Sequence, residues 1–356
     1  MYKLREKKMK LYTRCLPLGA LPYETVEAAT KMEAKLFEKM PFLARLPKID
    51  ADDDIINRTF ENFPGVKIDK HEVILKITSN HYKQRISKLE KAFNHPSLSD
   101  LELFGITAPF MEKYLQMIKK FEPPYAVINL LGPFTISQML QNAAEGQMLI
   151  DKSYRKLFIQ GICVKALWMI EKVKEMSPKT DTIIVFEEPL LGQLGDIKRN
   201  NEEVTNELVI AMFSRVFEKL HEAGAVVGVQ SLDKCDWKIP IAAGADLISF
   251  DAYNNPNNLT ILPEQIVEFV ERGGKINWGI VPTMNEAMIK SLNIDYLTKR
   301  LLSTMEGLIL AGVPEKYVYN SAMVSLQGDV DNLPILFAEK AIILATQLAK
   351  RIPVKK

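Results

Sequence analysis

Polar side chains end two short apolar runs within the stretch AVVGVQSLDKCDWKIPIAAGADLISFDAY, residues 225–253. The first run stops at Gln230, which Ser231 follows, and the second stops at Asp251. An amide and a hydroxyl can hydrogen-bond a ligand, and a carboxylate can bind a cation or exchange a proton. Asp251 has an alternative role, in which it forms an Asx turn with the backbone near Asn254. Both run ends are therefore candidate binding positions.

Two adjacent carboxylates, Glu187 and Glu188, end the run TIIVFEE at residues 182–188. Neighbouring residues of a strand point to opposite faces, so only one of the two can face a site. The sequence does not decide which one. We assign Glu188 and Asp251 as the candidate catalytic carboxylates, with a solvated acidic turn as the alternative for the glutamate pair.

From residue 125 onward, short apolar runs rich in β-branched residues alternate with longer helical patterns. This alternation is typical of βα units that build a parallel sheet. Most of the strand runs are apolar throughout, as expected of strands buried on both faces. The expected strands are 125–131, 182–188, 225–230, 246–251, 275–281 and 316–322, and the clearest helical patterns are 151–176, 201–224 and 294–312.

The N-terminal third can supply two more strands, at 11–19 and 72–78, which would make eight βα units. We therefore predict an α/β protein with a (β/α)8 TIM barrel, folded as a single domain over residues 1–356. Segments 40–70 and 79–122 are expected to be N-terminal excursions that cap the barrel. No glycine-rich phosphate-binding loop follows any of the runs, which argues against a nucleotide-binding fold.

In such a barrel the active site forms at the carboxyl ends of the strands, where the βα loops converge. The expected strand ends thus supply substrate-binding side chains without any catalytic motif. The set combines hydrogen-bonding groups, a lysine at the rim and an aromatic residue for the floor: Tyr23, Lys48, Gln230, Ser231, Trp237 and Ser321.

The charge balance argues against a nucleic-acid or membrane partner. Lys and Arg number 46 against 44 Asp and Glu, so there is no basic excess for a phosphate backbone. No apolar run approaches the roughly 20 residues that span a bilayer, and the first ten residues are too polar for a secretion signal. Three separated cysteines argue against a disulfide framework. These features predict a cytoplasmic protein with a small-molecule substrate, and they leave the oligomeric state open.

Seven segments follow one another in order along the chain: GALPYETVEAA (19–29), PFLARLPK (41–48), GPFTISQML (132–140), IVFEEPLL (184–191), CDW (235–237), ISFDAY (248–253) and GIVPT (279–283). Taken together, they resemble the superfamily of cobalamin-independent methionine synthase and uroporphyrinogen decarboxylase. The closer resemblance is to its single-barrel, methionine-synthase-like branch, and it covers most of the chain. It implies the barrel fold and a methyltransferase-like, one-carbon chemistry.

Methyl-transferring members of that superfamily hold a zinc ion that turns an acceptor thiol into a thiolate. The resemblance implies four ligand positions: a His and a Cys two residues apart, a carboxylate, and a last Cys. In this chain they fall on Gln230 and Leu232, on Asp251, and on or beside Met323 and Val324. Amide and apolar side chains do not form the tetrahedral nitrogen and sulfur site that zinc prefers. We therefore predict no metal.

Three functions remain open. The first is a zinc-independent, methyltransferase-like enzyme, for which the resemblance alone implies a corrinoid protein or a folate as methyl donor. The second is a catalytically inactive, ligand-binding or regulatory paralogue that keeps the pocket. The third is a metal-free decarboxylase or lyase on the same scaffold. The sequence does not decide whether the protein is an enzyme.

Overall fold

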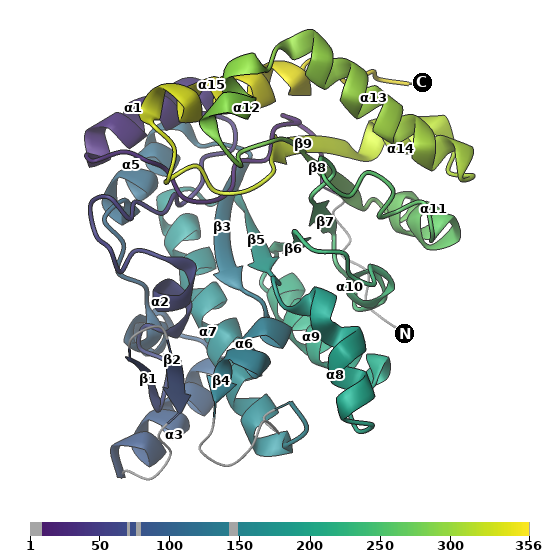
Figure 1. The fold of residues 1–356 in the computed structure, drawn as a ribbon. Coiled ribbons are helices and arrows are strands. Elements are labelled where there is room, and N and C mark those ends of the chain that lie inside the picture. The colour runs from purple at the N-terminus through teal and green to yellow at the C-terminus, as the bar shows by residue number, and fades with distance from the viewer. Residues whose placement is uncertain (1–8, 70–71, 76–79, 142–148, 356) are drawn as a thin grey trace.

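The computed structural model describes residues 9–69, 72–75, 80–141 and 149–355, and it centres on a curved, six-stranded parallel sheet (Figure 1). The strands follow one another across the sheet in chain order, and neighbours pair in parallel register. The strands are β3 (Tyr125–Leu131), β5 (Asp181–Glu187), β6 (Val226–Ser231), β7 (Leu247–Phe250), β8 (Lys275–Val281) and β9 (Ala322–Leu326). Five of them confirm expected strands to within about two residues.

Helices connect these strands, as parallel pairing requires. Side-chain caps define where several of them begin: Asp151 caps α7, Thr205 caps α9 and Asn293 caps α13. The helices after β3 are α6 (Pro133–Met139), α7 (Lys152–Met176), α8 (Leu194–Asn200), α9 (Asn206–Glu222), α10 (Lys238–Ala242), α11 (Pro263–Glu271), α12 (Glu286–Ser291), α13 (Ile294–Leu310), α14 (Glu315–Ser321) and α15 (Ile335–Ala349).

The N-terminal third is mostly helical and carries a small separate sheet. In that sheet β1 pairs antiparallel with β2, and β2 pairs in parallel with β4. Helices α3, α4 and α5 pack along α7 on the outside of the large sheet. The elements are α1 (Val26–Leu36), α2 (Ile55–Phe60), β1 (Val66–Asp69), β2 (Glu72–Leu75), α3 (Asn80–Asn94), α4 (Leu98–Leu101), α5 (Met111–Phe121) and β4 (Leu140–Gln141).

The expected eight-stranded, closed TIM barrel is wrong. The large sheet has six strands and forms a half-barrel. The expected strand at 72–78 contributes β2 to the small sheet, with residues 76–79 outside the described part of the chain. The expected strand at 11–19 forms no strand, although isolated bridges join Cys15 to Val324, Ala20 to Arg45, and Phe42 to Val127.

Those bridges place two irregular segments, residues 13–21 and 41–45, between the edge strands β9 and β3. Proline explains why neither segment forms a regular strand, because a proline nitrogen donates no ladder hydrogen bond. Pro17 lies within the first segment, and Pro41 begins the second. The segments still bring Arg45 to the carboxyl edge of the sheet.

The expected strand at 316–322 is also wrong, because residues Glu315–Ser321 form helix α14 and the last strand begins at Ala322. Pro314 stands directly before the helix, where its fixed φ favours a helix start. The carboxyl end of the last strand therefore lies at Leu326, five residues beyond Ser321. Within the described residues, no helix is long and apolar enough to cross a membrane.

Candidate functional site

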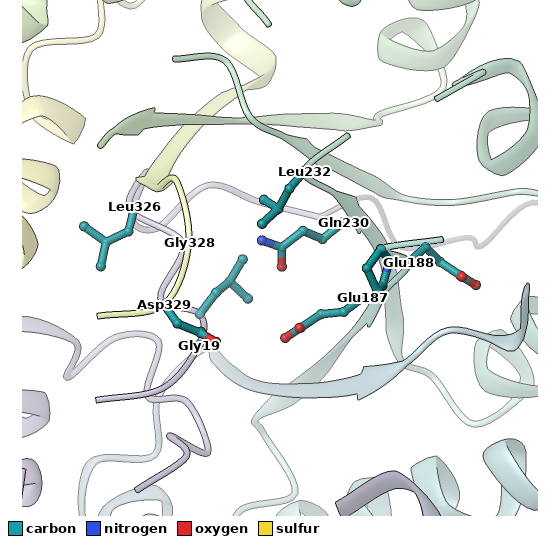
Figure 2. Close-up of a pocket in the computed structure, with 10 residues that line it drawn as sticks. Gly19, Glu187, Glu188, Gln230, Leu232, Leu326, Gly328 and Asp329 are labelled. Atoms are coloured by element: carbon teal, nitrogen blue, oxygen red, sulfur yellow. The ribbon is translucent and has the colours of Figure 1, made fainter. Parts of the chain in front are cut away.

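A pocket of about 90 Å³ lies at the carboxyl edge of the parallel sheet (Figure 2). This volume suits a ligand of a few heavy atoms, since pockets for larger ligands typically enclose roughly 300–1,000 Å³. The lining comes from the ends of β5, β6 and β9 and from the segment before α1: Leu18, Gly19, Glu187, Glu188, Pro189, Gln230, Leu232, Leu326, Gly328 and Asp329.

A buried guanidinium joins the two sides of this pocket. The Arg45 side chain is 4% exposed, and its Nη1 donates to Glu187 Oε1 at 2.9 Å. Its Nη2 donates to Asp329 Oδ1 and Oδ2 at 2.9 and 3.0 Å. Burial by itself lowers the pKa of Arg45, but the two carboxylates outweigh burial and raise that pKa. Arg45 is therefore a fixed cation that positions both carboxylates.

The adjacent glutamates have separate roles, as expected of neighbours on a strand. Glu187 points into the pocket and also accepts a hydrogen bond from Asn129 Nδ2 at 2.9 Å. The carboxylate of Glu188 points away from the pocket and is fully buried. The sequence did not decide which of the two glutamates faces the site, and in the structure it is Glu187.

Glu188 instead binds the first turn of α6. Its Oε1 accepts from the Phe134 backbone N–H at 2.9 Å, and its Oε2 accepts from the Thr135 N–H and Oγ1 at 2.7 Å each. Burial raises the pKa of Glu188 to about 7, against the opposing effect of these donors. A Cβ atom at Gly132 would lie 2.1 Å from Glu188 Oε1, so glycine is needed there. The carboxylate of Glu188, which we predicted to be catalytic, therefore does not contact the pocket.

Gln230 lies beside Glu187 in the β5–β6 register and directs its amide into the pocket. Its Oε1 atom is buried and accepts no hydrogen bond from any described residue. A buried acceptor without a donor costs free energy, so Oε1 favours a ligand that donates, whereas Nε2 of the same amide is itself a donor. Leu232, two residues further on, lines the same side and is 42% exposed.

Asp251, the second predicted catalytic carboxylate, is 4% exposed and does not line this pocket. Its Oδ1 accepts from the Asn254 backbone N–H at 2.9 Å, and its Oδ2 accepts from Asn254 Nδ2 at 2.8 Å. Gln327 Nε2 donates to the same Oδ2 at 2.9 Å. The turn that we gave as the alternative for Asp251 is therefore formed, and the carboxylate is fully engaged within the chain.

The other predicted substrate-binding residues lie outside the pocket lining. The Tyr23 hydroxyl donates to Glu339 Oε1 at 2.9 Å, and Lys48 is exposed. Trp237 is fully buried and packs at its edge against Phe250.

Ser231 and Ser321 are also turned to structural contacts. Ser231 Oγ donates to the Asp233 carbonyl at 3.3 Å, and Ser321 Oγ donates to the Tyr317 carbonyl at 2.6 Å. Ser321 stands at the amino end of β9, at the opposite edge of the sheet, because the strand begins six residues later than expected.

Sequence reasoning missed Arg45 and Asp329. Arg45 is a lone charge within the run PFLARLP, and a charge in an apolar run signals a buried ion pair. Asp329 follows the last strand by three residues, so it was hidden by the misplaced strand boundary.

The residues at the implied zinc positions do not fit zinc. Gln230 and Leu232 offer an amide and an apolar group, Asp251 is already bonded within the chain, and Met323 and Val324 lie inside β9. No group of three or more His, Cys, Asp or Glu side chains in the described ranges is placed to hold a metal. We therefore derive no step that needs zinc.

Neither the protein-family models nor the curated proteins give a match to this chain. The resemblance to the methionine synthase superfamily thus depends on the quoted segments alone.

Proposed function

We propose that the protein binds a small molecule with a protonated amine, or a similar cation, in the pocket between Glu187, Gln230 and Asp329. One observation supports this most strongly. Two carboxylates face a single guanidinium there, and the Oε1 atom of Gln230 is a buried acceptor without a donor. An ammonium group would supply up to three donors and the missing positive charge.

The binding experiment uses short alkylamines and, for comparison, short carboxylic acids and neutral alcohols of equal length. A ligand that binds only the folded state raises the melting temperature by mass action. We expect an amine to raise the melting temperature of the wild-type protein and the acids and alcohols to have no such effect. Isothermal titration calorimetry would then give the dissociation constant of the best amine.

Glu187→Gln removes the inward carboxylate but keeps its shape. Because a charge-assisted hydrogen bond contributes about 1.5–3 kcal/mol, we expect the dissociation constant of the amine to rise by roughly 10- to 100-fold. Glu202→Gln, at an exposed position between α8 and α9, makes the same change away from the pocket and should leave it unchanged. Equal amine binding by the Glu187 and Glu202 variants would contradict the proposal.

A second candidate function is zinc-independent methyl transfer to such an amine. It is favoured by the convergence of resembling segments, because Gly19, Glu187 and Pro189 come from two of them and line the pocket together with Gln230. In this reaction the ammonium gives a proton to Glu187, and the free amine forms a bond to the methyl group as the donor leaves. Glu188 and Asp251 take no part in that step, because intrachain hydrogen bonds occupy both carboxylates.

The transfer is tested by incubating the protein and each bound amine with a methyl-corrinoid or a methyl-folate, the donors that the resemblance implies. Mass spectrometry would detect an N-methylated product that depends on Glu187. Tight binding without product from either donor would favour the ligand-binding function over the enzyme.

A further inference from the structure

The Arg45 guanidinium and the backbone N–H of Ala20 form an anion-binding cradle in this pocket. We propose that Asp329 is a built-in carboxylate that fills this cradle, so that the pocket selects cations that have no carboxylate of their own. The selection of cations rests on the proposed function above. The inference that Asp329 fills the cradle depends only on contacts within the chain, so it can be tested separately from the selection of cations.

The cradle consists of the Arg45 guanidinium and the backbone N–H of Ala20. Ala20 N donates to Asp329 Oδ1 at 2.8 Å, and Arg45 Nη2 lies 2.9 and 3.0 Å from Oδ1 and Oδ2. Three hydrogen bonds thus converge on one carboxylate from two segments that are distant from it in the chain. A guanidinium nitrogen beside a backbone N–H supplies charge-assisted donors of the kind that bind carboxylates.

The backbone beside the cradle is shaped for this close approach. Gly19 has a φ of +100°, which side-chain-bearing residues rarely adopt. A Cβ atom at Gly19 would lie 2.3 Å from Asp329 Oδ1, so any other residue would collide with the carboxylate. The turn at Gly19 both presents the Ala20 N–H and leaves room for the Asp329 oxygen.

The filled cradle leaves no cationic donor for a second carboxylate. The other arm of Arg45 is bonded to Glu187, and the described pocket lining contains no further Arg, Lys or His. The groups that remain are the Glu187 carboxylate and the Gln230 amide, with Oε1 as an acceptor and Nε2 as a neutral donor. A ligand carboxylate would face the carboxylates of Glu187 and Asp329, with only the neutral amide of Gln230 as a side-chain donor, and such like-charge contact is strongly unfavourable. Asp329 is therefore a specificity-determining residue.

Asp329 can be removed without opening the protein core, because its side chain is 45% exposed in the loop after β9. Asp329→Ala leaves both donor groups, the Ala20 N–H and Arg45 Nη2, facing an empty position of carboxylate size. Asp329→Asn removes the charge but keeps the cradle filled, because an amide oxygen can still accept from Ala20. Asp331→Ala is the matched control for the loss of a nearby negative charge. Asp331 lies in the same loop and interacts with Arg45 and Asp329 through charge, but it makes no described hydrogen bond to Ala20 or Arg45.

The experiment titrates acetate and formate into the four proteins, with sodium chloride at equal ionic strength as the reference for salt effects. We expect acetate to bind Asp329→Ala at least tenfold more tightly than it binds the wild type, Asp329→Asn or Asp331→Ala, by calorimetry and by thermal shift. Equal acetate binding by wild type and Asp329→Ala, or an equal gain in Asp331→Ala, would overturn the proposal. If Asp329→Ala folds only in acetate and not in chloride, that rescue supports it.

A wild-type comparison covers the case in which Asp329→Ala folds in neither salt. Propylamine and 4-aminobutyrate carry the same amine, and only the second has a carboxylate. We expect propylamine to bind at least tenfold more tightly, and equal binding would overturn the proposal. If the wild type binds neither amine while Asp329→Ala gains acetate, the proposed function fails and the filled cradle stands.

Discussion

At the scale of single residues, one pair of neighbours shows how the alternation of side chains along a strand gives adjacent residues different roles. Glu187 and Glu188 are identical in type and adjacent, yet one faces the pocket and the other binds the start of α6. The partly exposed Glu187 has a cationic partner in Arg45. The fully buried Glu188 has neutral donors only, and burial raises its pKa to about 7.

This difference predicts a pH-dependent stability that belongs to Glu188. Between about pH 4.3, where a glutamate ionises in the unfolded chain, and pH 7, the folded protein keeps a proton that the unfolded chain has released. The free energy of unfolding should therefore fall as the pH rises, by up to about 1.4 kcal/mol per unit. Urea unfolding across this range should show that slope in the wild type and lose it in Glu188→Gln. Parallel curves for the two proteins would refute the assignment.

At the scale of elements, helix α7 fixes the N-terminal third to the sheet through a buried lysine. Lys165 is 1% exposed, and its ammonium donates to the backbone carbonyls of Glu61 at 2.7 Å, Phe104 at 3.1 Å and Gly105 at 3.4 Å. Burial lowers the pKa of Lys165 to about 7. Three carbonyls from two loops thus share one donor group on the helix.

Lys165→Met should therefore destabilise the protein, because the three carbonyls lose their donor without gaining water. We expect a loss of about 1–3 kcal/mol, the cost of leaving buried polar groups unsatisfied. Chemical denaturation would measure it, and hydrogen exchange should quicken at the loops near residues 61 and 105. Lys174→Met, on the same helix and 43% exposed, is the control that should change little. Similar losses for the two variants would contradict a special role for Lys165.

At the scale of the whole molecule, the half-barrel sheet depends on irregular segments to connect its two edges. Residues 13–21 and 41–45 link β9 to β3 through isolated bridges rather than ladders. Arg45 adds ion pairs to Glu187 at the end of β5 and to Asp329 after β9. The same residue that orders the pocket therefore also ties opposite sides of the sheet together.

Arg45→Met tests this connection. Removing one partner of a buried ion pair typically costs about 3–5 kcal/mol, and we expect the lower end because Asp329 is 45% exposed. Hydrogen exchange at β3 and β9 should quicken more than exchange at the central strand β7. Arg199→Met breaks an ion pair with Asp196 whose partners are 73% and 67% exposed, and it should have no measurable effect. Uniform exchange across the sheet would argue against the edge connection.

The amino-acid sequence by itself determined the five strands β3, β5, β6, β7 and β8, because runs that are buried on both faces are apolar throughout and stand out from their flanks. It also placed Gln230 at a strand end and required that only one of the two adjacent glutamates face a site. It did not decide which one, and the catalytic role was assigned to Glu188, whereas Glu187 faces the pocket. It misplaced the last strand, since YVYNS has residues that suit strands but follows a proline helix start.

Only the tertiary structure decided the arrangement of the N-terminal third and the composition of the pocket. Apolar patterning sets local periodicity, and it carries no information on which distant segments pair. Arg45, Glu187 and Asp329 are up to 284 residues apart, and their contact follows from how the two sheet edges are joined. For the same reason the sequence predicted catalytic roles for Asp251 and Glu188. The fold brings Gln327 close to Asp251 and Thr135 close to Glu188, and these partners hold the two carboxylates in structural hydrogen bonds.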